Sequence, residues 1–295
     1  MKRLFVLLLL LLFIFNTGYC QSTYPPNDRA NHNRVNTRKN LLQKYTLDQL
    51  SAMIASGNFD DIYVGDYIEM EMTTVISGNN VTEKVRWLVG AIDYFYNRTD
   101  SAITTHHIVL VAEDGFITQH RMNSSNTTTG GFAGSEMYTA TLPLYDTAIT
   151  NAFGSSHILS YHQLLTTSMS STIPSMAGNN YSGASNGWAW ANGSGTNPHI
   201  TKLCLMSEPQ LFGTKVCSSS FYDIGINNSQ FPLFAQMPEK IKAGRGIDKS
   251  ATKAQAFFLL NIVSSTYFGN CNGYGASQFS GGGNTFSLRP YFLFY

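Results

Sequence analysis

The stretch DIYVGDYIEMEMTTV (61–75), with EKVRWLVGAIDYFY (83–96) and HHIVLVAED (106–114) after it, decides the fold class of this chain. The first two segments alternate polar and apolar residues with period two, as strands with one buried face do. Gly78-Asn79-Asn80 stands between them and predicts a hairpin turn. The third segment is almost wholly apolar, which predicts a more deeply buried strand. We therefore expect an antiparallel strand region at this point of the chain.

Helical spacing is found on both sides of this strand region. In NLLQKYTLDQLSAMIASGNF, apolar residues recur with helical period, Thr46 is a candidate N-cap and Gly57 a C-terminal stop, so we expect a helix at about 47–56. The segment EMYTATLPLYDTAITNAFG (136–154) outlines a second helix, with Pro143 in its first turn or at a break. Helices and strands in separate blocks predict an α+β fold.

The second half of the chain is rich in loops. MNSSNTTTGGFAGS (122–135) is predicted to be a flexible Gly/Ser/Thr loop, and from residue 157 onward short apolar segments are set in long connections. Loops of this length in a compact domain are usually functional or are packed by their own aromatic residues. We therefore divide the domain into a helix and strand part, which ends at about residue 130, and a loop-rich part (131–295).

The N-terminus has the pattern of a secretory signal peptide. Residues 4–15, LFVLLLLLLFIF, follow Met-Lys-Arg and precede a short polar segment with small residues that ends at Cys20. This apolar run of roughly a dozen residues is shorter than the ~20 that span a bilayer as a helix. We expect a signal peptide (1–20), a flexible polar leader (21–40) and a single domain (41–295) that is secreted or at the cell surface. A lipid anchor on Cys20 is the alternative.

Composition argues against several classes of partner. Only 13% of residues are charged and the net charge is +1, so neither a nucleic-acid footprint nor electrostatic membrane attachment is indicated. No later stretch is long and apolar enough to be a transmembrane segment. Asn-x-Ser/Thr sequons occur at Asn80, Asn97, Asn123, Asn126, Asn180, Asn192 and Asn227. A eukaryotic secretory route would treat them as glycan acceptors, but an Asn-rich chain also forms such sequons by chance.

Three cysteines follow the signal peptide. We expect a disulfide between Cys204 and Cys217, which flank LMSEPQLFGTKV and would bridge two neighbouring strands. Cys271 would then be free, or it would replace one of the two partners. Neither a His nor a second Cys stands at ligand spacing beside any of the three, so no metal site is expected here.

The residues do not form a catalytic motif. His106 and His107 are adjacent on a predicted strand and would point to opposite faces, so a buried, hydrogen-bonded histidine is favoured over a metal ligand. The chain has no Gly-x-Ser-x-Gly elbow, and SGGGNTF (280–286) lacks the Lys-Ser/Thr of a phosphate loop. We predict no catalytic residues and no cofactor, although calcium held by oxygen ligands would leave no linear signature.

Two segments have the composition of recognition loops. Tyr and Trp offer rigid contact area with a polar handle, while Asn, Gln, Ser and Gly supply adaptable hydrogen bonds. The alternative is that these aromatic rings close the loops onto the core. The candidate ligand-binding residues are Tyr181, Trp188, Trp190, Asn192, Tyr267, Asn270, Asn272, Tyr274 and Gln278.

Several segments, in order, carry a resemblance to a known family. They are FDDIYVGDYI (59–68), VRWLVGAIDYFYN (85–97), TTHHIVLVAED (104–114), FAGSEMYTATLP (132–143), WAWANG (188–193), CLMSEPQLFG (204–213), QFPLF (230–234) and FFLLNIVSSTYFGNCNGYGASQFSGGGNTFSLRPYFLFY (257–295). Residues 45 to 295 thereby resemble an uncharacterised domain family of phage tail and structural proteins and of gut-bacterial surface proteins. The last segment is similar to the closing strands of C-type-lectin-like domains, which include phage receptor-binding proteins and formylglycine-generating enzymes.

The resemblance implies a C-type-lectin-like fold in which Leu288, Tyr291, Phe292 and Leu293 supply a terminal core strand. Family members often carry Trp-Leu-Arg where this chain has Phe258-Leu259-Leu260-Asn261, so an arginine beside the ligand face is missing. Glu208-Pro209-Gln210 imitates a lectin calcium loop only partly, and a turn between the strands of Cys204 and Cys217 explains it better.

We therefore expect a non-catalytic recognition or adhesion module that binds an extracellular glycan or protein through its C-terminal loops. The alternative is a structural subunit of a phage-tail-like or extracellular assembly, with self-association through the aromatic loops. A weaker alternative, a formylglycine-generating-type oxidase, would need Cys217 and Cys271 side by side.

Overall fold

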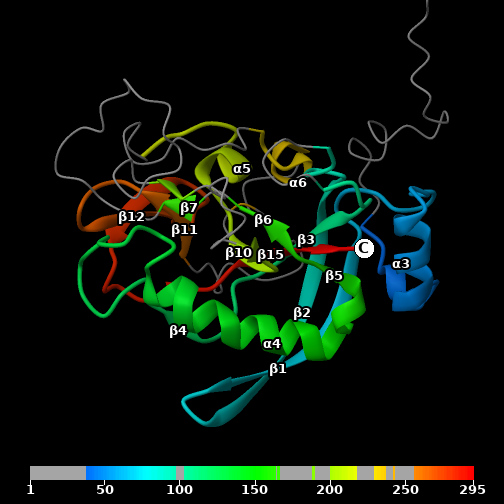
Figure 1. Ribbon diagram of the computed structural model, residues 1–295, viewed down its shortest axis with the longest axis horizontal. Coiled ribbons are helices and arrows are strands. Elements are labelled where there is room, and N and C mark those ends of the chain that lie inside the picture. The colour runs from blue at the N-terminus through cyan, green and yellow to red at the C-terminus, as the bar shows by residue number, and fades with distance from the viewer. Residues whose placement is uncertain are drawn as a thin grey trace, which may run out of the picture.

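The protein has an α+β fold built on two β-sheets, seen in a computed structural model (Figure 1). It describes residues 38–97, 103–163, 165–166, 188–189, 200–217, 229–236, 242 and 256–295. The predicted signal peptide and most of the predicted leader lie outside the described residues. Among the helices that the structure describes, none combines the length and the apolar character needed to cross a membrane.

The first sheet has the order β1-β2-β3-β15-β10, and β5 pairs with β15 as well. Its strands are β1 (Tyr67–Ile76), β2 (Asn79–Ile92), β3 (Ile108–Ala112), β5 (Ile158–Leu159), β10 (Leu203–Leu205) and β15 (Pro290–Phe294). All pairings in it are antiparallel. The last strand in the chain therefore lies inside the sheet, between β3 and β10. This confirms the terminal core strand expected from the closing residues.

The three N-terminal strands are confirmed, with shifted ends. The β1–β2 turn is Ser77-Gly78, one residue earlier than predicted, and both residues have positive φ angles of 51° and 80°. Such turns match the twist of the paired strands. β1 begins at Tyr67 and not at residue 61, because Asp61 and Gly65 also take positive φ values that a regular strand excludes. The far end of this hairpin projects beyond the helical layer (Figure 1).

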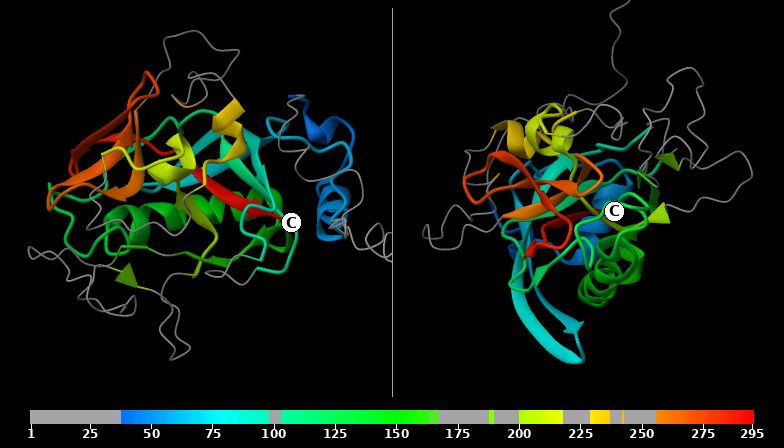
Figure 2. Two further views of the ribbon diagram at one scale, coloured as in Figure 1. Left: turned by 90° about the horizontal axis from the view of Figure 1, so that it is seen from above. Right: turned by 90° about the vertical axis from the view of Figure 1, so that its left-hand side faces the viewer.

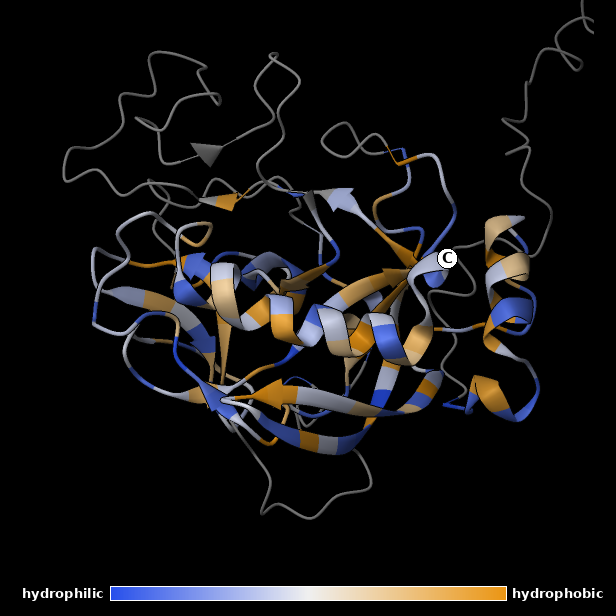
Figure 3. Cartoon of the chain, turned by 60° about the horizontal axis from the view of Figure 1, so that its bottom comes forward, coloured by the Kyte–Doolittle hydropathy of each residue, from blue (hydrophilic) through white to orange (hydrophobic). Residues whose placement is uncertain are grey.

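Both predicted helices are present. Helix α3 (Leu47–Ala55) begins at Thr46, which forms a capping box with Gln49. The second helical segment is a short π-helix η2 (Met137–Thr141) that continues into α4 (Leu142–Phe153), with Pro143 in the first turn. The buried residues of α4 recur at helical spacing and face the first sheet, across which the helix runs (Figure 3).

The second sheet lies at the opposite end of the molecule from α3 (Figure 2). Its order is β13-β12-β11-β14-β4, antiparallel except for the β11–β14 pair. The strands are β4 (Gln119–His120), β11 (Phe257–Ile262), β12 (Tyr267–Cys271), β13 (Ser277–Gly281) and β14 (Phe286–Ser287). The remaining elements are η1 (Leu41–Gln43), η3 (Ser155–His157), β6 (Tyr161–His162), β7 (Leu165–Thr166), β8 (Trp188–Ala189), β9 (Ile200–Thr201), α5 (Glu208–Phe212) and α6 (Pro232–Gln236).

An aromatic core joins α4 to the first sheet. Trp87 on β2 is fully buried, and its ring lies 6.3 Å from that of Phe153 on α4 and 5.0 Å from that of Phe292 on β15. The ring of Phe116 lies 6.1 Å away. Edge-to-face contacts of this kind stabilise aromatic pairs beyond the burial of their surface.

Arg289 connects the two sheets. It precedes β15 and is fully buried, with its guanidinium between the rings of Phe234 on α6 and Phe257 on β11 at 5.4 and 5.1 Å. Its Nε donates to the Ala112 carbonyl oxygen at 2.9 Å, and Nη1 donates to the Lys242 carbonyl oxygen at 3.0 Å. Burial lowers the pKa of Arg289 to about 10. The arginine of the Arg-Pro-aromatic ending is thus part of the interior.

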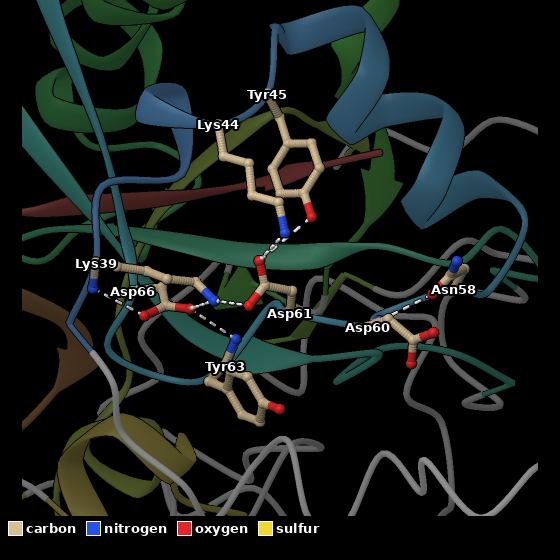
Figure 4. A network of polar contacts seen from close by, with 8 residues as sticks. All are labelled: Lys39, Lys44, Tyr45, Asn58, Asp60, Asp61, Tyr63 and Asp66. Atoms are coloured by element: carbon tan, nitrogen blue, oxygen red, sulfur yellow. Dashed lines mark hydrogen bonds and ion pairs between the residues drawn. The ribbon is translucent and has the colours of Figure 1, made fainter.

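The described part of the chain begins within the predicted leader, where an ion-pair network holds it (Figure 4). The Lys39 backbone N–H donates to Asp66 Oδ1 at 3.0 Å, and the Lys39 ammonium pairs with Asp61. Lys44 also pairs with Asp61, at 2.9 Å. These two cations, Lys39 before Lys44, lower the pKa of Asp61 to about 2. Residues 38–40 therefore belong to the folded domain and not to a flexible leader.

Candidate functional site

The β12–β13 hairpin presents the clearest recognition surface in the described part of the chain. Tyr267 to Cys271 pair in register with Gly281 to Ser277, and residues 272–276 form the connection. Asn272 Oδ1 accepts hydrogen bonds from the Tyr274 N–H at 2.9 Å and from the Ala276 N–H at 3.0 Å. This internal bonding orders the tip of the hairpin.

One face of the hairpin exposes aromatic rings to solvent. Tyr267 and Phe279 stand two residues apart in register on neighbouring strands, with ring centroids 5.3 Å apart and exposed fractions of 41% and 52%. Tyr274 at the tip is 79% exposed, and the Gln278 side chain is exposed too. No Asp, Glu, Lys, Arg or His occurs from residue 267 to residue 281. We call Tyr267, Tyr274 and Phe279 the hairpin surface; Gln278 is exposed on the opposite face of β13.

Part of the other face of the hairpin is interior, which corrects part of the predicted site. Asn270 is buried, and its amide donates to Ser280 Oγ at 2.7 Å, so it is not available to a ligand. Phe268 is buried beside it and packs against Phe258 of β11. Asn272 uses its side-chain oxygen to form the turn. Of the five residues predicted in this segment, Tyr267, Tyr274 and Gln278 are exposed, Gln278 on the face opposite Tyr267, while Asn270 and Asn272 have structural roles.

The predicted loop at 122–135 is hydrogen-bonded to residues that flank the two hairpin strands. Asn126 Oδ1 accepts from the Gly283 N–H at 3.0 Å, and the Thr128 hydroxyl donates to the Ser264 carbonyl oxygen at 2.7 Å. The N–H of Met122 also donates to the Gly282 carbonyl oxygen at 2.9 Å. These contacts give the loop a defined path instead of the flexibility that its composition suggested.

The remaining predicted ligand residues cannot be placed beside this surface. Tyr181, Trp190 and Asn192 lie outside the described residues, and of Trp188 the structure gives only its position in strand β8. Phe279 was not among the predicted residues. Strand alternation could have found it, since Phe279 is apolar next to the polar Gln278 and lies on the opposite face from it.

Two predictions about the segment after β10 are wrong. Glu208-Pro209-Gln210 begins helix α5, with Ser207 as N-cap, so these residues are not a turn between two paired strands. Cys204 and Cys217 are both free thiols and form no disulfide. Cys204 lies on β10, in register with Tyr291 of β15, and is fully buried in the first sheet. Helix α5 instead leads Cys217 toward the second sheet.

A buried carboxylate fixes the position of Cys217. Glu208 is fully buried, and its Oε1 accepts from the Cys217 N–H at 2.9 Å and from the Ser277 hydroxyl at 2.7 Å. Oε2 accepts from the Val216 N–H at 3.0 Å. The N–H of Glu208 donates to Asn261 Oδ1 at 2.6 Å. Glu208 therefore holds the hairpin where its connection meets β13.

One residue of the predicted histidine pair, His107, has a structural role. His107 is fully buried, with Nε2 accepting from the Phe95 N–H at 3.1 Å and Nδ1 lying 3.0 Å from the Thr105 carbonyl oxygen. Burial lowers its pKa. This confirms the buried, hydrogen-bonded histidine. His106 pairs with Asp93 at 2.7 Å. Among the residues described, no group of three or more His, Cys, Asp or Glu side chains could hold a metal ion.

Comparisons of the chain with protein-family models, with curated proteins and with solved structures found no match.

Proposed function

We propose that this chain is a non-catalytic recognition module that binds a neutral extracellular glycan through the hairpin surface. The observation that carries the proposal is the exposed pair of rings, Tyr267 and Phe279, held 5.3 Å apart on two paired strands. Large exposed apolar groups clustered on one element mark a contact surface more often than chance exposure does. The two adjacent rings, inclined at 55° to each other, offer an apolar contact surface, and the faces of sugar rings are apolar C–H surfaces.

The polar groups around the rings favour a neutral ligand. The hydroxyls of Tyr267 and Tyr274 each provide both a donor and an acceptor. The lack of Asp, Glu, Lys, Arg and His from residue 267 to residue 281 means that the hairpin itself carries no formal charge to attract an acidic or basic polymer. The internally bonded turn keeps these groups ordered before binding, which reduces the entropy lost on association.

A C-type-lectin-like arrangement is part of this proposal. Support comes from the α+β composition, from the two sheets, and from the return of the late strand β15 to the side of the early strand β3. The sequence resemblance of the closing segment (257–295) supports it further.

The test is a glycan array probed with the purified chain, with calcium and again with a chelator. We expect saturable binding to neutral glycans that is lost in Tyr267→Ala and in Phe279→Ala. Ile117→Ala is the matched control, because Ile117 is a 64% exposed apolar residue outside the hairpin. Loss of binding in the presence of the chelator would show that calcium takes part in glycan binding.

A folded chain that leaves the array blank would contradict the proposal. The same holds for glycan binding that survives both aromatic substitutions. If the folded chain instead self-associates in sedimentation velocity, and Tyr267→Ala or Phe279→Ala abolishes that association, the hairpin surface is a subunit contact of an assembly.

A further inference from the structure

Cys217 and Cys271 approach the same side chain from two directions. The Cys217 Sγ lies 3.4 Å from the Ser277 Oγ. Cys271 is the direct cross-strand partner of Ser277 in the β12–β13 ladder. Directly opposed residues of antiparallel strands point to the same face, with Cβ atoms about 4.5–5.5 Å apart. The two thiols are therefore separated by little more than one serine side chain.

The third thiol belongs to the other sheet. Cys204 belongs to β10 of the first sheet, where it opposes Tyr291, whereas Ser277 and Cys271 belong to the second sheet. The contacts of Glu208 with Cys217 and Ser277 hold the segment after α5 over β13. Folding thus selects one of the three cysteine pairings that the sequence allows.

We propose that Cys217 and Cys271 form a disulfide when the folded chain meets a disulfide oxidant such as oxidised glutathione. Cys217 is partly exposed, and its thiolate attacks the oxidant, which forms a mixed disulfide and releases one glutathione thiol. The Cys271 sulfur then attacks the Cys217 sulfur and displaces the second glutathione. Two protein thiols are oxidised by two electrons, one glutathione disulfide is reduced to two thiols, and both protons leave with them.

The buried position of Cys271 sets the order of these steps. Its thiol contacts the carbonyl oxygens of Lys242 at 3.4 Å and Asn272 at 3.6 Å, so it must turn about its Cα–Cβ bond to reach Cys217. Burial raises the pKa of Cys271 to about 12, against the opposing effect of Arg289 and Lys242. Cys271 is thus the slower, second thiol. The resulting bond would tie the segment after α5 to the end of β12 that leads into the hairpin connection, and it does not depend on any ligand.

Peptide mapping of the full chain tests the pairing. The chain is equilibrated with reduced and oxidised glutathione, trapped with iodoacetamide without reduction, digested and analysed by mass spectrometry. We expect the Cys217 and Cys271 peptides joined, with Cys204 alkylated only after unfolding. A Cys204–Cys217 link, a Cys204–Cys271 link, or three unlinked thiols after equilibration would overturn the proposal.

Thermal unfolding with and without a phosphine reductant gives a second readout. We expect reduction to lower the melting temperature by roughly 5–10 °C in the wild type and in Cys204→Ala. The difference should vanish in Cys217→Ser and Cys271→Ser. If Cys271→Ser fails to fold, the partly exposed Cys217→Ser decides the test, since a reductant effect that persists in it contradicts the pairing.

Discussion

The Ser277 hydroxyl donates a hydrogen bond of 2.7 Å to Glu208 Oε1, although 69 residues separate the two in the chain. The same carboxylate accepts from the backbone N–H groups of Val216 and Cys217. Because Glu208 is fully buried, water cannot take the place of its carboxylate as the acceptor for these donors. One side chain therefore holds helix α5, the segment after it and strand β13 in a fixed arrangement.

We expect Glu208→Ala to lower the free energy of unfolding by about 3 kcal/mol, because buried donors lose their acceptor. Glu208→Gln keeps one oxygen and should cost roughly half as much. The control is Glu71→Ala on the exposed side of β1, which should stay within about 0.5 kcal/mol of the wild type. Urea denaturation measures all three. An effect of Glu208→Ala no larger than that of Glu71→Ala would show that the network contributes no stability.

Trp87 should be the most sensitive residue of the first sheet. Trp87→Ala leaves a large cavity between Phe153, Phe292 and Phe116, and we expect a loss of about 3–5 kcal/mol. Trp87→Phe should cost much less. It keeps a ring in the site, and it removes an indole N–H that is buried without a hydrogen-bond partner. Equal losses for the two variants in denaturant titrations would contradict this account of the core.

The Asp61 ion pairs predict a pH-dependent contribution to stability. Asp61 has a pKa of about 2 in the folded chain against 3.8 ordinarily, so its charged form favours folding. This contribution is complete above about pH 3.8 and is lost as the pH falls toward 2. Because the side chain is 37% exposed, solvent screening limits the effect to less than about 1 kcal/mol.

Asp61→Asn isolates this contribution, since Asn tolerates the left-handed φ of 69° at this position. We expect the variant to be slightly less stable than the wild type near neutral pH and equally stable near pH 2. Chemical denaturation across this range gives the comparison. A stability difference that stays constant with pH would mean that the carboxylate charge is not responsible.

Two sequons should behave differently in a eukaryotic secretory host. Asn80 is exposed beside the β1–β2 turn. Asn123 is buried, donates to the Thr127 carbonyl oxygen at 2.7 Å and accepts from the Glu136 N–H at 3.0 Å. We expect glycopeptide mapping of the secreted, folded chain to find a glycan on Asn80 and none on Asn123. A glycan on Asn123 in folded material would contradict the hydrogen bonds seen there.

The sequence predicted regular elements well wherever periodicity alone determines them. The strands around Gly78, the buried strand after His107 and the capped helix after Thr46 follow from local patterns. Element ends were less accurate, because positive φ angles at Asp61 and Ser77 interrupt a polar and apolar alternation that continues through them. Such angles depend on the surrounding contacts and leave no clear local pattern.

The candidate site was predicted only in part. Tyr274 and Gln278 were correctly placed among exposed residues because they stand in a Gly-rich turn and on an edge strand. Asn270 was misjudged, since its burial depends on the pairing of β12 with β11, which spacing does not reveal. The prediction of a Cys204–Cys217 disulfide was wrong for a similar reason. Ser207-Glu208-Pro209 is a helix start, and the helix carries Cys217 away from Cys204.

Because β15 is the last strand of the first sheet in chain order and lies inside that sheet, the sheet cannot be completed until β15 has been synthesised. β3 and β10 cannot be joined until residues 290–294 have been made, and the pairing of Tyr291 with Val111 spans most of the domain. A nascent chain that has not reached this strand exposes the open edges of β3 and β10, and such edges readily pair with other chains. We therefore expect the emerging polypeptide to need protection from aggregation, and folding to proceed at the slow pace typical of long-range strand pairing.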